Sequence, residues 1–221
     1  IRNIYGDYFC VGVAAYPEGH ADESHPSGQS LEHDLPYLVE KVQAGADFIM
    51  TQLFFDTEAY EKFETVLRRH SSGAFKDIPI IPGMMPIQSY QILKRTTKLS
   101  HAKLPERIIK RLDEVKGDDE MVKKVGVDIV SEIVETVKMI KSRTPGPRGF
   151  HFYTLNLEKA VAFILERTNL IPASSPPNGD ESALIEMDES ISALKINGSS
   201  STNGIPPTGK TISTSVIRID R

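Results

Sequence analysis

Polar side chains occur near the ends of three apolar segments of this 221-residue chain. Tyr16 ends the segment 8–16, Gln52 lies within the second such segment, and Tyr153 lies near the end of a third. Burying an amide without partners for its donors and acceptor is costly. Gln52 therefore either hydrogen-bonds a heterocycle held against a sheet or is a structural amide bonded to a loop carbonyl.

Two further pairs of residues could contact a ligand. Tyr16 and His20 follow the first apolar segment, where an aromatic ring and an imidazole could stack on a ligand or simply pack the loop. Asp34 and Lys41 are seven residues apart, so they share one face of a helix. They could bind ribose and phosphate oxygens of a nucleotide, or they could form an ordinary solvated face.

Several other chemistries are disfavoured by the motifs. His20, Asp22, Glu23 and His25 crowd one loop, but their spacing matches no zinc motif, and we predict no metal site. The chain has neither a glycine-rich phosphate motif nor a G-x-S-x-G element. Cys10 is the only cysteine, which excludes an intrachain disulfide and favours a reducing, cytoplasmic location.

Composition narrows the class of protein further. The chain has 26 basic and 30 acidic residues and a net charge of −4, which disfavours a nucleic-acid-binding protein. No apolar segment approaches the roughly 20 residues of a membrane-spanning helix. The first residues have no long apolar stretch, so we expect no signal peptide.

Strands and helices alternate in the pattern before residue 170. Near-continuous apolar segments predict buried strands over 8–16, 47–55, 78–83 and 149–154. Apolar residues at helical spacing predict helices over 31–42, 56–67, 89–99, 105–115, 119–141 and 157–166.

Three details of these helices can be predicted. In the first helix, Pro36 indicates that regular structure starts near that residue, because proline is best tolerated in a first turn. Asp56 is expected to cap the second helix. The last helix is expected to bury Ala160, Phe163 and Ile164.

This alternation predicts an α/β fold with a parallel sheet and helical crossovers. Two architectures remain open: a small doubly wound sheet, or part of an eight-stranded β/α barrel, which typically needs about 250 residues. In both, ligands bind at the carboxyl ends of the strands. The segment 171–221 has no Phe, Tyr or His and is rich in Ser, Pro and Gly, so we predict a disordered linker. Within it, 183–196 could form a short helix or docking peptide.

Four separated segments resemble one enzyme family. Residues 14–20, 44–56, 81–87 and 151–156 occur in this order and at these spacings in methylenetetrahydrofolate reductases. The chain resembles the second half of that family's catalytic domain, in its eukaryotic, fungal form. The resemblance implies a (β/α)8 TIM-type barrel of which 1–170 carries about the last four β/α units. The segment 171–221 resembles the linker that follows this domain.

The resemblance implies flavin chemistry. In that family NAD(P)H passes a hydride to FAD, which then reduces 5,10-methylenetetrahydrofolate to 5-methyltetrahydrofolate for methionine synthesis. The family's substrate contacts match Gln52, whose amide would meet the folate, and Tyr153. The family's FAD contacts match Tyr16, His20, Asp34 and Lys41.

The chain also departs from the family. Leu157 stands where the family often has an arginine that anchors substrate. The family's general acid and a flavin-side aspartate belong to the other half of the barrel, so no catalytic residue is assigned here. We therefore expect the chain to be inactive without the N-terminal half, and the parent enzyme could dimerise through a regulatory domain. The alternatives are a non-catalytic module that binds flavin or the enzyme, and a small sheet with an unrelated ligand.

Overall fold

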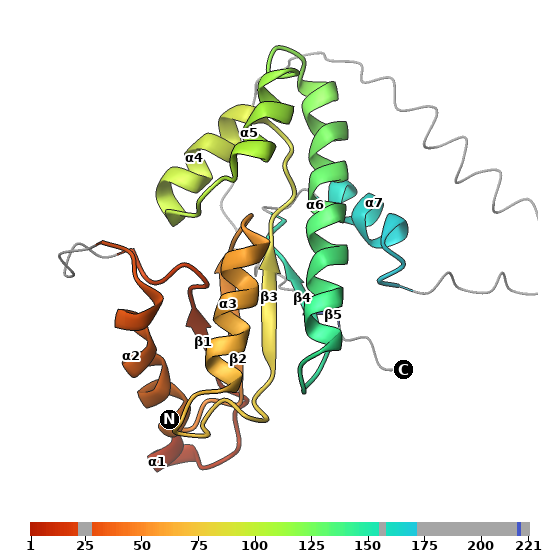
Figure 1. Cartoon of the computed structure of the whole chain (residues 1–221). Coiled ribbons are helices and arrows are strands. Elements are labelled where there is room, and N and C mark those ends of the chain that lie inside the picture. Colours follow the sequence, from red (N-terminus) through yellow and green to blue (C-terminus); the bar gives the residue numbers. More distant parts are fainter. Residues whose placement is uncertain (22–27, 155–157, 172–215, 218–221) are drawn as a thin grey trace, which may run out of the picture. The chain divides into compact units, whose positions relative to one another are not determined.

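The computed structural model describes residues 1–21, 28–154, 158–171 and 216–217 (Figure 1). The strands are β1 (Gly12–Ala15), β2 (Phe48–Leu53), β3 (Ile80–Met84), β4 (Phe150–Phe152) and β5 (Val216–Ile217). The helices are α1 (Arg2–Tyr5), α2 (Leu31–Gln43), α3 (Thr57–Arg68), α4 (Tyr90–Ser100), α5 (Glu106–Asp113), α6 (Asp119–Ser142) and α7 (Lys159–Arg167).

The sheet has the strand order β1-β2-β3-β4-β5, in which the first four strands are parallel and β5 is antiparallel to β4. Each parallel strand lies next to the one before it in the chain. Right-handed crossovers in such an order place every connecting helix on the same face of the sheet. A doubly wound sheet reverses its order and carries helices on both faces. The α/β fold is thus confirmed, and its order is consistent with consecutive units of a β/α barrel.

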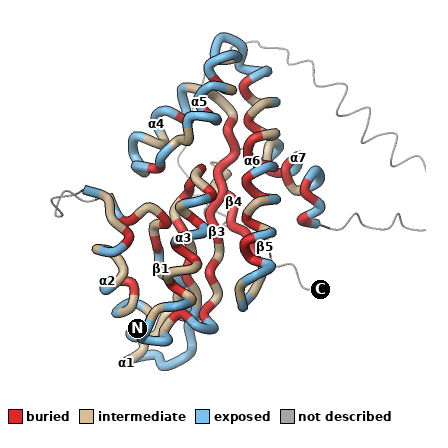
Figure 2. The backbone as a smooth tube through the Cα atoms, in the orientation of Figure 1, coloured by how far each residue is buried: buried red, intermediate tan, exposed pale blue. Residues whose placement is uncertain are grey.

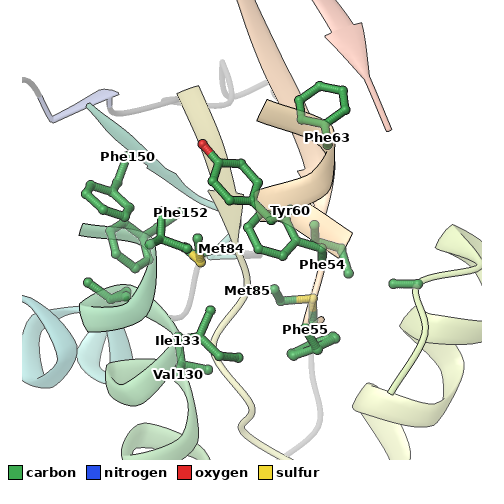
Figure 3. Close-up of a cluster of buried hydrophobic side chains, with 14 of the residues drawn as sticks. Phe54, Phe55, Tyr60, Phe63, Met84, Met85, Val130, Ile133, Phe150 and Phe152 are labelled. Carbon is green, nitrogen blue, oxygen red and sulfur yellow. The ribbon is translucent and has the colours of Figure 1, made fainter. Parts of the chain in front are cut away.

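The main core lies between the sheet and the helices. Helix α6 contacts α3, α5 and α7, which joins these helices into one layer. Figure 3 shows aromatic and aliphatic side chains from this core, including Phe54, Tyr60 and Phe63. Phe54 and Tyr60 stack with ring centroids 4.7 Å apart, and Tyr60 and Phe63 are fully buried. Strands β3 and β4 are mostly buried, β2 is buried at alternate residues, and β1 buries only Ala15 (Figure 2).

The opposite face of the sheet is less covered. In β2, Ile49, Thr51 and Leu53 are buried, whereas the alternating residues Phe48, Met50 and Gln52 are partly exposed. Since successive side chains of a strand point to opposite faces, these two sets define two sides of the sheet. We call the side that bears Phe48, Met50 and Gln52 the open face.

The predicted helices are all present, and several of their ends are explained by local caps. Asp56 caps α3 as expected, because its carboxylate accepts hydrogen bonds from the N–H groups of Glu58 and Ala59. The prediction that α2 starts near Pro36 was wrong. Ser30 accepts a hydrogen bond from the His33 N–H, so the helix begins at Leu31 and Pro36 lies inside it. The cap stabilises a first turn that the proline rule alone does not predict.

The predicted strand 8–16 was too long. Only Gly12–Ala15 form β1, and Tyr8 and Phe9 are 81% and 46% exposed. Arg2 causes part of this difference, because its guanidinium donates hydrogen bonds to the carbonyls of Phe9 and Gly45. These bonds hold the segment before β1 in an irregular path beside α1.

Two further predictions concern the C-terminal part. In α7, Phe163 is exposed and Val161 is buried instead, because Val161, Ile164 and Thr168 share the covered face. The predicted disordered linker lies outside the described residues except for Val216–Ile217, which form β5. None of the helices in the described parts of the chain is long and apolar enough to cross a membrane.

Candidate functional site

Tyr153 extends from the end of β4 across the open face. Its backbone N–H donates to the Met84 carbonyl at 2.8 Å, and its hydroxyl donates to the Thr51 carbonyl at 2.9 Å. The ring lies against Gly83, where an added Cβ would be 2.7 Å from Tyr153 Cε2 and 2.4 Å from the Thr51 oxygen. Glycine at position 83 therefore allows Tyr153 to reach β2.

Gln52 lies on the open face next to the carbonyl that Tyr153 contacts. Its Oε1 accepts a hydrogen bond from the Leu53 N–H at 3.0 Å. Within the described ranges, no hydrogen bond from its Nε2 is found. The bond to a loop carbonyl, which was the structural alternative, is thus not seen among the described residues. The acceptor of this amide is paired with the neighbouring backbone N–H, and its donors are available to a ligand. The two residues expected to bind substrate, Gln52 and Tyr153, are brought together.

Tyr16 and His20 lie at the end of β1. Their ring centroids are 4.6 Å apart in an edge-to-face arrangement. A turn joins them, in which the Gly19 N–H donates to the Tyr16 carbonyl at 2.9 Å. Gly19 has φ 87°, and a Cβ there would be 2.3 Å from the Ser30 backbone, so this turn requires glycine. Burial, and to a smaller extent nearby Tyr16, raises the pKa of Tyr153.

Asp34 and Lys41 both lie on α2. The Lys41 ammonium donates to the Ala14 carbonyl of β1 at 3.4 Å. Asp34 is partly exposed in the first turn of the helix, seven residues earlier, which corresponds to about 10 Å along the axis. The structure therefore connects Lys41 to β1, and Asp34 lies too far along the helix to share a small ligand with it. An extended ligand could contact both.

Glu18 is a polar residue of this edge that the sequence did not single out. Its carboxylate accepts hydrogen bonds from the Lys103 N–H, at 3.0 and 3.3 Å for its two oxygens. Burial raises the pKa of this carboxyl, and the Lys103 N–H partly opposes that change. Glu18 also lines a cavity of about 360 Å³ with Ser30, Asp56 and Lys103. An acidic residue shortly after a predicted strand was the signal that could have identified it.

His151 is a second residue that was not assigned a role. It lies in β4, is 4% exposed, and its ring contacts Tyr153 edge-to-face at 4.4 Å. Burial lowers the pKa of this imidazole. The argument that marked Gln52, a polar side chain in an apolar strand, applies equally to His151.

Four residues named in the sequence analysis belong to segments that the structure does not describe. Asp22, Glu23, His25 and Leu157 lie outside the described residues. Over the described ranges, no group of three or more His, Cys, Asp or Glu side chains could hold a metal ion.

Residues 1–169 match the model of the family described as methylenetetrahydrofolate reductase. The chain belongs to the methylenetetrahydrofolate reductase family. It is 51% identical over 173 residues to methylenetetrahydrofolate reductase 2 of Schizosaccharomyces pombe, covering 77% of this chain and 26% of that protein. It is 36% identical over 197 residues to methylenetetrahydrofolate reductase 2 of Saccharomyces cerevisiae, covering 89% and 31%. The resemblance to fungal reductases is thereby confirmed.

This reductase-family chain spans about a quarter to a third of the length of those relatives. A solved structure with a similar fold is an uncharacterized protein from Clostridium thermocellum, which binds two copies of 5-methyl-5,6,7,8-tetrahydrofolic acid. The match has a TM-score of 0.53 and 18% identity, and it covers 73% of this chain and 54% of that chain. At this identity the likeness supports the fold only.

Proposed function

We propose that this chain is part of an FAD-dependent enzyme that reduces 5,10-methylenetetrahydrofolate to 5-methyltetrahydrofolate with NAD(P)H. The proposal combines family membership with the geometry of the site. The observation that carries it is the contact between the Tyr153 hydroxyl and the Thr51 carbonyl, next to Gln52. This contact joins the two residues that would bind the folate at the carboxyl edge of the sheet, where such folds bind ligands.

The residues at β1 and α2 fit a flavin dinucleotide in their chemistry. Tyr16 and His20 offer aromatic surface at the strand end, and Lys41 offers a cation for a phosphate group. Asp34, about 10 Å further along α2, is suited to a hydroxyl group of the same extended ligand. When bound, FAD supplies the hydride transfer, and the protein's residues bind and orient it.

The same proposal includes assembly with further β/α units. Among the described strands, β1 pairs only with β2, so one edge of β1 is free. A free strand edge and an open apolar face are features that pairing with more strands would cover. We propose that this part of the chain acts within a complete barrel in the cytoplasm, where the parent enzyme can dimerise. By itself it is inactive, and it provides part of the folate and flavin contacts.

Retention of flavin tests the cofactor assignment. The chain is mixed with FAD, desalted, and examined for flavin absorbance, with circular dichroism as the check on folding. We expect the chain to retain flavin and Lys41→Gln to lose at least about tenfold in affinity, since it removes a charge-assisted contact. Lys124→Gln is the matched control, because Lys124 is an exposed lysine on α6.

A folded chain that retains no flavin would contradict the cofactor assignment. Equal loss in the Lys41 and Lys124 variants would show that general charge, rather than the proposed site, attracts the flavin. Turnover of methylenetetrahydrofolate with NADPH by the purified chain would contradict the proposed inactivity.

A further inference from the structure

We propose that His151 is an additional ligand-binding residue of this site, which donates a hydrogen bond from Nε2 to a carbonyl oxygen of a lactam ring on the open face. The inference rests on the proposed function, which supplies two ligands that contain such a ring, a flavin and a folate.

His151 lies in β4 and Tyr153 follows that strand directly, and their side chains lie on the same face of the sheet. They are two residues apart, and their rings meet edge-to-face with centroids 4.4 Å apart. Because side chains two residues apart along a strand share a face, His151 lies one layer deeper than Tyr153 on the open face. Its strand neighbour is Gly83, and the lack of a side chain there lets the Tyr153 ring lie over β3 next to the imidazole. A ligand beside Tyr153 would therefore lie above the imidazole.

The two ring nitrogens of His151 differ in their surroundings. Nδ1 is sealed from solvent and has no hydrogen-bond partner among the described residues. Nε2 is not sealed in this way, although the residue as a whole is only 4% exposed. Since buried N–H groups without a partner are rarer than buried acceptors without one, we assign the proton to Nε2.

This arrangement also selects the charge state of the ring. An imidazolium would place a second N–H, on Nδ1, where no acceptor is available. Burial lowers the pKa of His151, which favours the neutral ring as well. A neutral ring with its proton on Nε2 is a hydrogen-bond donor at the only nitrogen that is not sealed.

A carbonyl oxygen is the acceptor that fits such a donor. A lactam ring also presents an N–H next to its carbonyl, so it needs donors and acceptors on the protein. Gln52, whose Nε2 donates no bond within the described ranges, and Tyr153 lie on the same face and complete such a set. Buried polar groups that are left unpaired discriminate strongly in favour of a ligand that pairs them.

Nitrogen NMR of the histidine side chains tests the inference. The full chain, labelled with ¹⁵N-histidine, is titrated separately with 5-methyltetrahydrofolate and with FAD. We expect the ligand-free spectrum to show His151 as the Nε2–H tautomer, and one of the two probes to shift its Nε2 resonance saturably. His70 is the control, because its Nδ1 lies 2.8 Å from Ser72 Oγ in an exposed loop.

Two variants measure the contribution of the donor. His151→Phe keeps a ring against Tyr153 but has no N–H, and we expect it to bind the active probe about tenfold more weakly. His151→Gln places an amide donor near the position of Nε2, and we expect it to recover part of that affinity. Circular dichroism confirms that both variants fold.

The possible outcomes separate the two proposals. Binding of a probe without a shift of His151, equal binding by His151→Phe, or an Nδ1–H tautomer overturns the role of His151 and leaves the proposed function intact. Failure of the folded chain to bind either probe overturns the proposed function and this inference with it. The probe that shifts His151 identifies the lactam as that of the folate or that of the flavin.

Discussion

Glu18 shows how one side chain connects distant segments. It follows β1, yet its carboxylate accepts hydrogen bonds from the N–H of Lys103, which precedes α5. The same burial that makes this link possible raises the pKa of the carboxyl above its usual 4.5. The residue is therefore expected to contribute to the pH dependence of stability.

The sign of that dependence follows from proton binding. Because the folded state holds the Glu18 proton more tightly than the unfolded state, the free energy of unfolding falls as the pH rises above about 4.5. We expect Glu18→Gln, which mimics the protonated acid, to remove this part of the fall. Urea unfolding of both proteins between pH 4 and 8 measures it. The opposite result would be that the unsubstituted protein gains stability relative to Glu18→Gln as the pH rises. It would mean that the Lys103 N–H stabilises the carboxylate more than burial destabilises it.

For single residues, the type and position of a polar side chain predicted some members of the candidate site but not all of them. Gln52 and Tyr153 were predicted and lie together, whereas His151 and Glu18 were not singled out. Whether a polar residue is sealed, paired or accessible depends on neighbours that are distant in the chain, such as Gly83 beneath Tyr153. No local pattern contains that information.

Among the elements, helices were predicted with the greatest accuracy because much of their start signal is local. Helix α6 illustrates this, since Asp118 accepts hydrogen bonds from the N–H groups of Glu120 and Met121 at 3.0 and 3.1 Å. Both strands and helices differ from prediction mainly at their ends. The ends of β1 and α2 depend on Arg2 and Ser30, which apolar spacing does not consider.

The cap of α6 leads to a prediction about stability. We expect Asp118→Ala to lower the free energy of unfolding by about 1 kcal/mol, because two N–H groups lose their acceptor. Asp119→Ala is the control, since Asp119 lies in the first turn but makes no cap bond, and its loss should cost only a few tenths of a kcal/mol. Urea unfolding compares them, and equal losses would show that charge near the helix start, not the cap bond, is responsible.

At the scale of the molecule, a buried polar network joins α3, β3 and α6. Glu64 is fully buried and accepts hydrogen bonds from Tyr60 at 2.6 Å and Thr144 at 2.7 Å. The Lys141 ammonium lies 3.6 Å from Glu64 and donates to the Ile80 carbonyl at 2.8 Å. Burial lowers the pKa of Lys141, while Glu64 opposes that change. Ile80 begins β3, so the network lies at the end of the sheet opposite the candidate site.

Removal of the single anion should unbalance this network. We expect Glu64→Gln to lower the free energy of unfolding by about 3–5 kcal/mol, because it removes the counter-charge of two buried cations, Lys141 and Arg68, which both lie 3.6 Å from Glu64. Glu135→Gln is the matched control on α6, where the exposed carboxylate pairs with Lys138 at 2.8 Å, and its cost should be below about 1 kcal/mol. A small loss for Glu64→Gln would indicate that Lys141 is neutral in the folded protein.

The sequence by itself determined the alternation of strands and helices and the family, and it predicted the carboxyl edge of the sheet as the place of the candidate site. These depend on local periodicity, on helix caps, and on the order of short segments along the chain, all of which the sequence contains. Only the tertiary structure decided the strand order, the open face, and the contact of Tyr153 with β2 beside Gln52. It also showed that His151 is sealed at one nitrogen and that Tyr8 and Phe9 are exposed. The physical reason is that pairing between strands and burial are set by contacts between segments far apart in the chain, and periodicity within a segment carries no record of its partners.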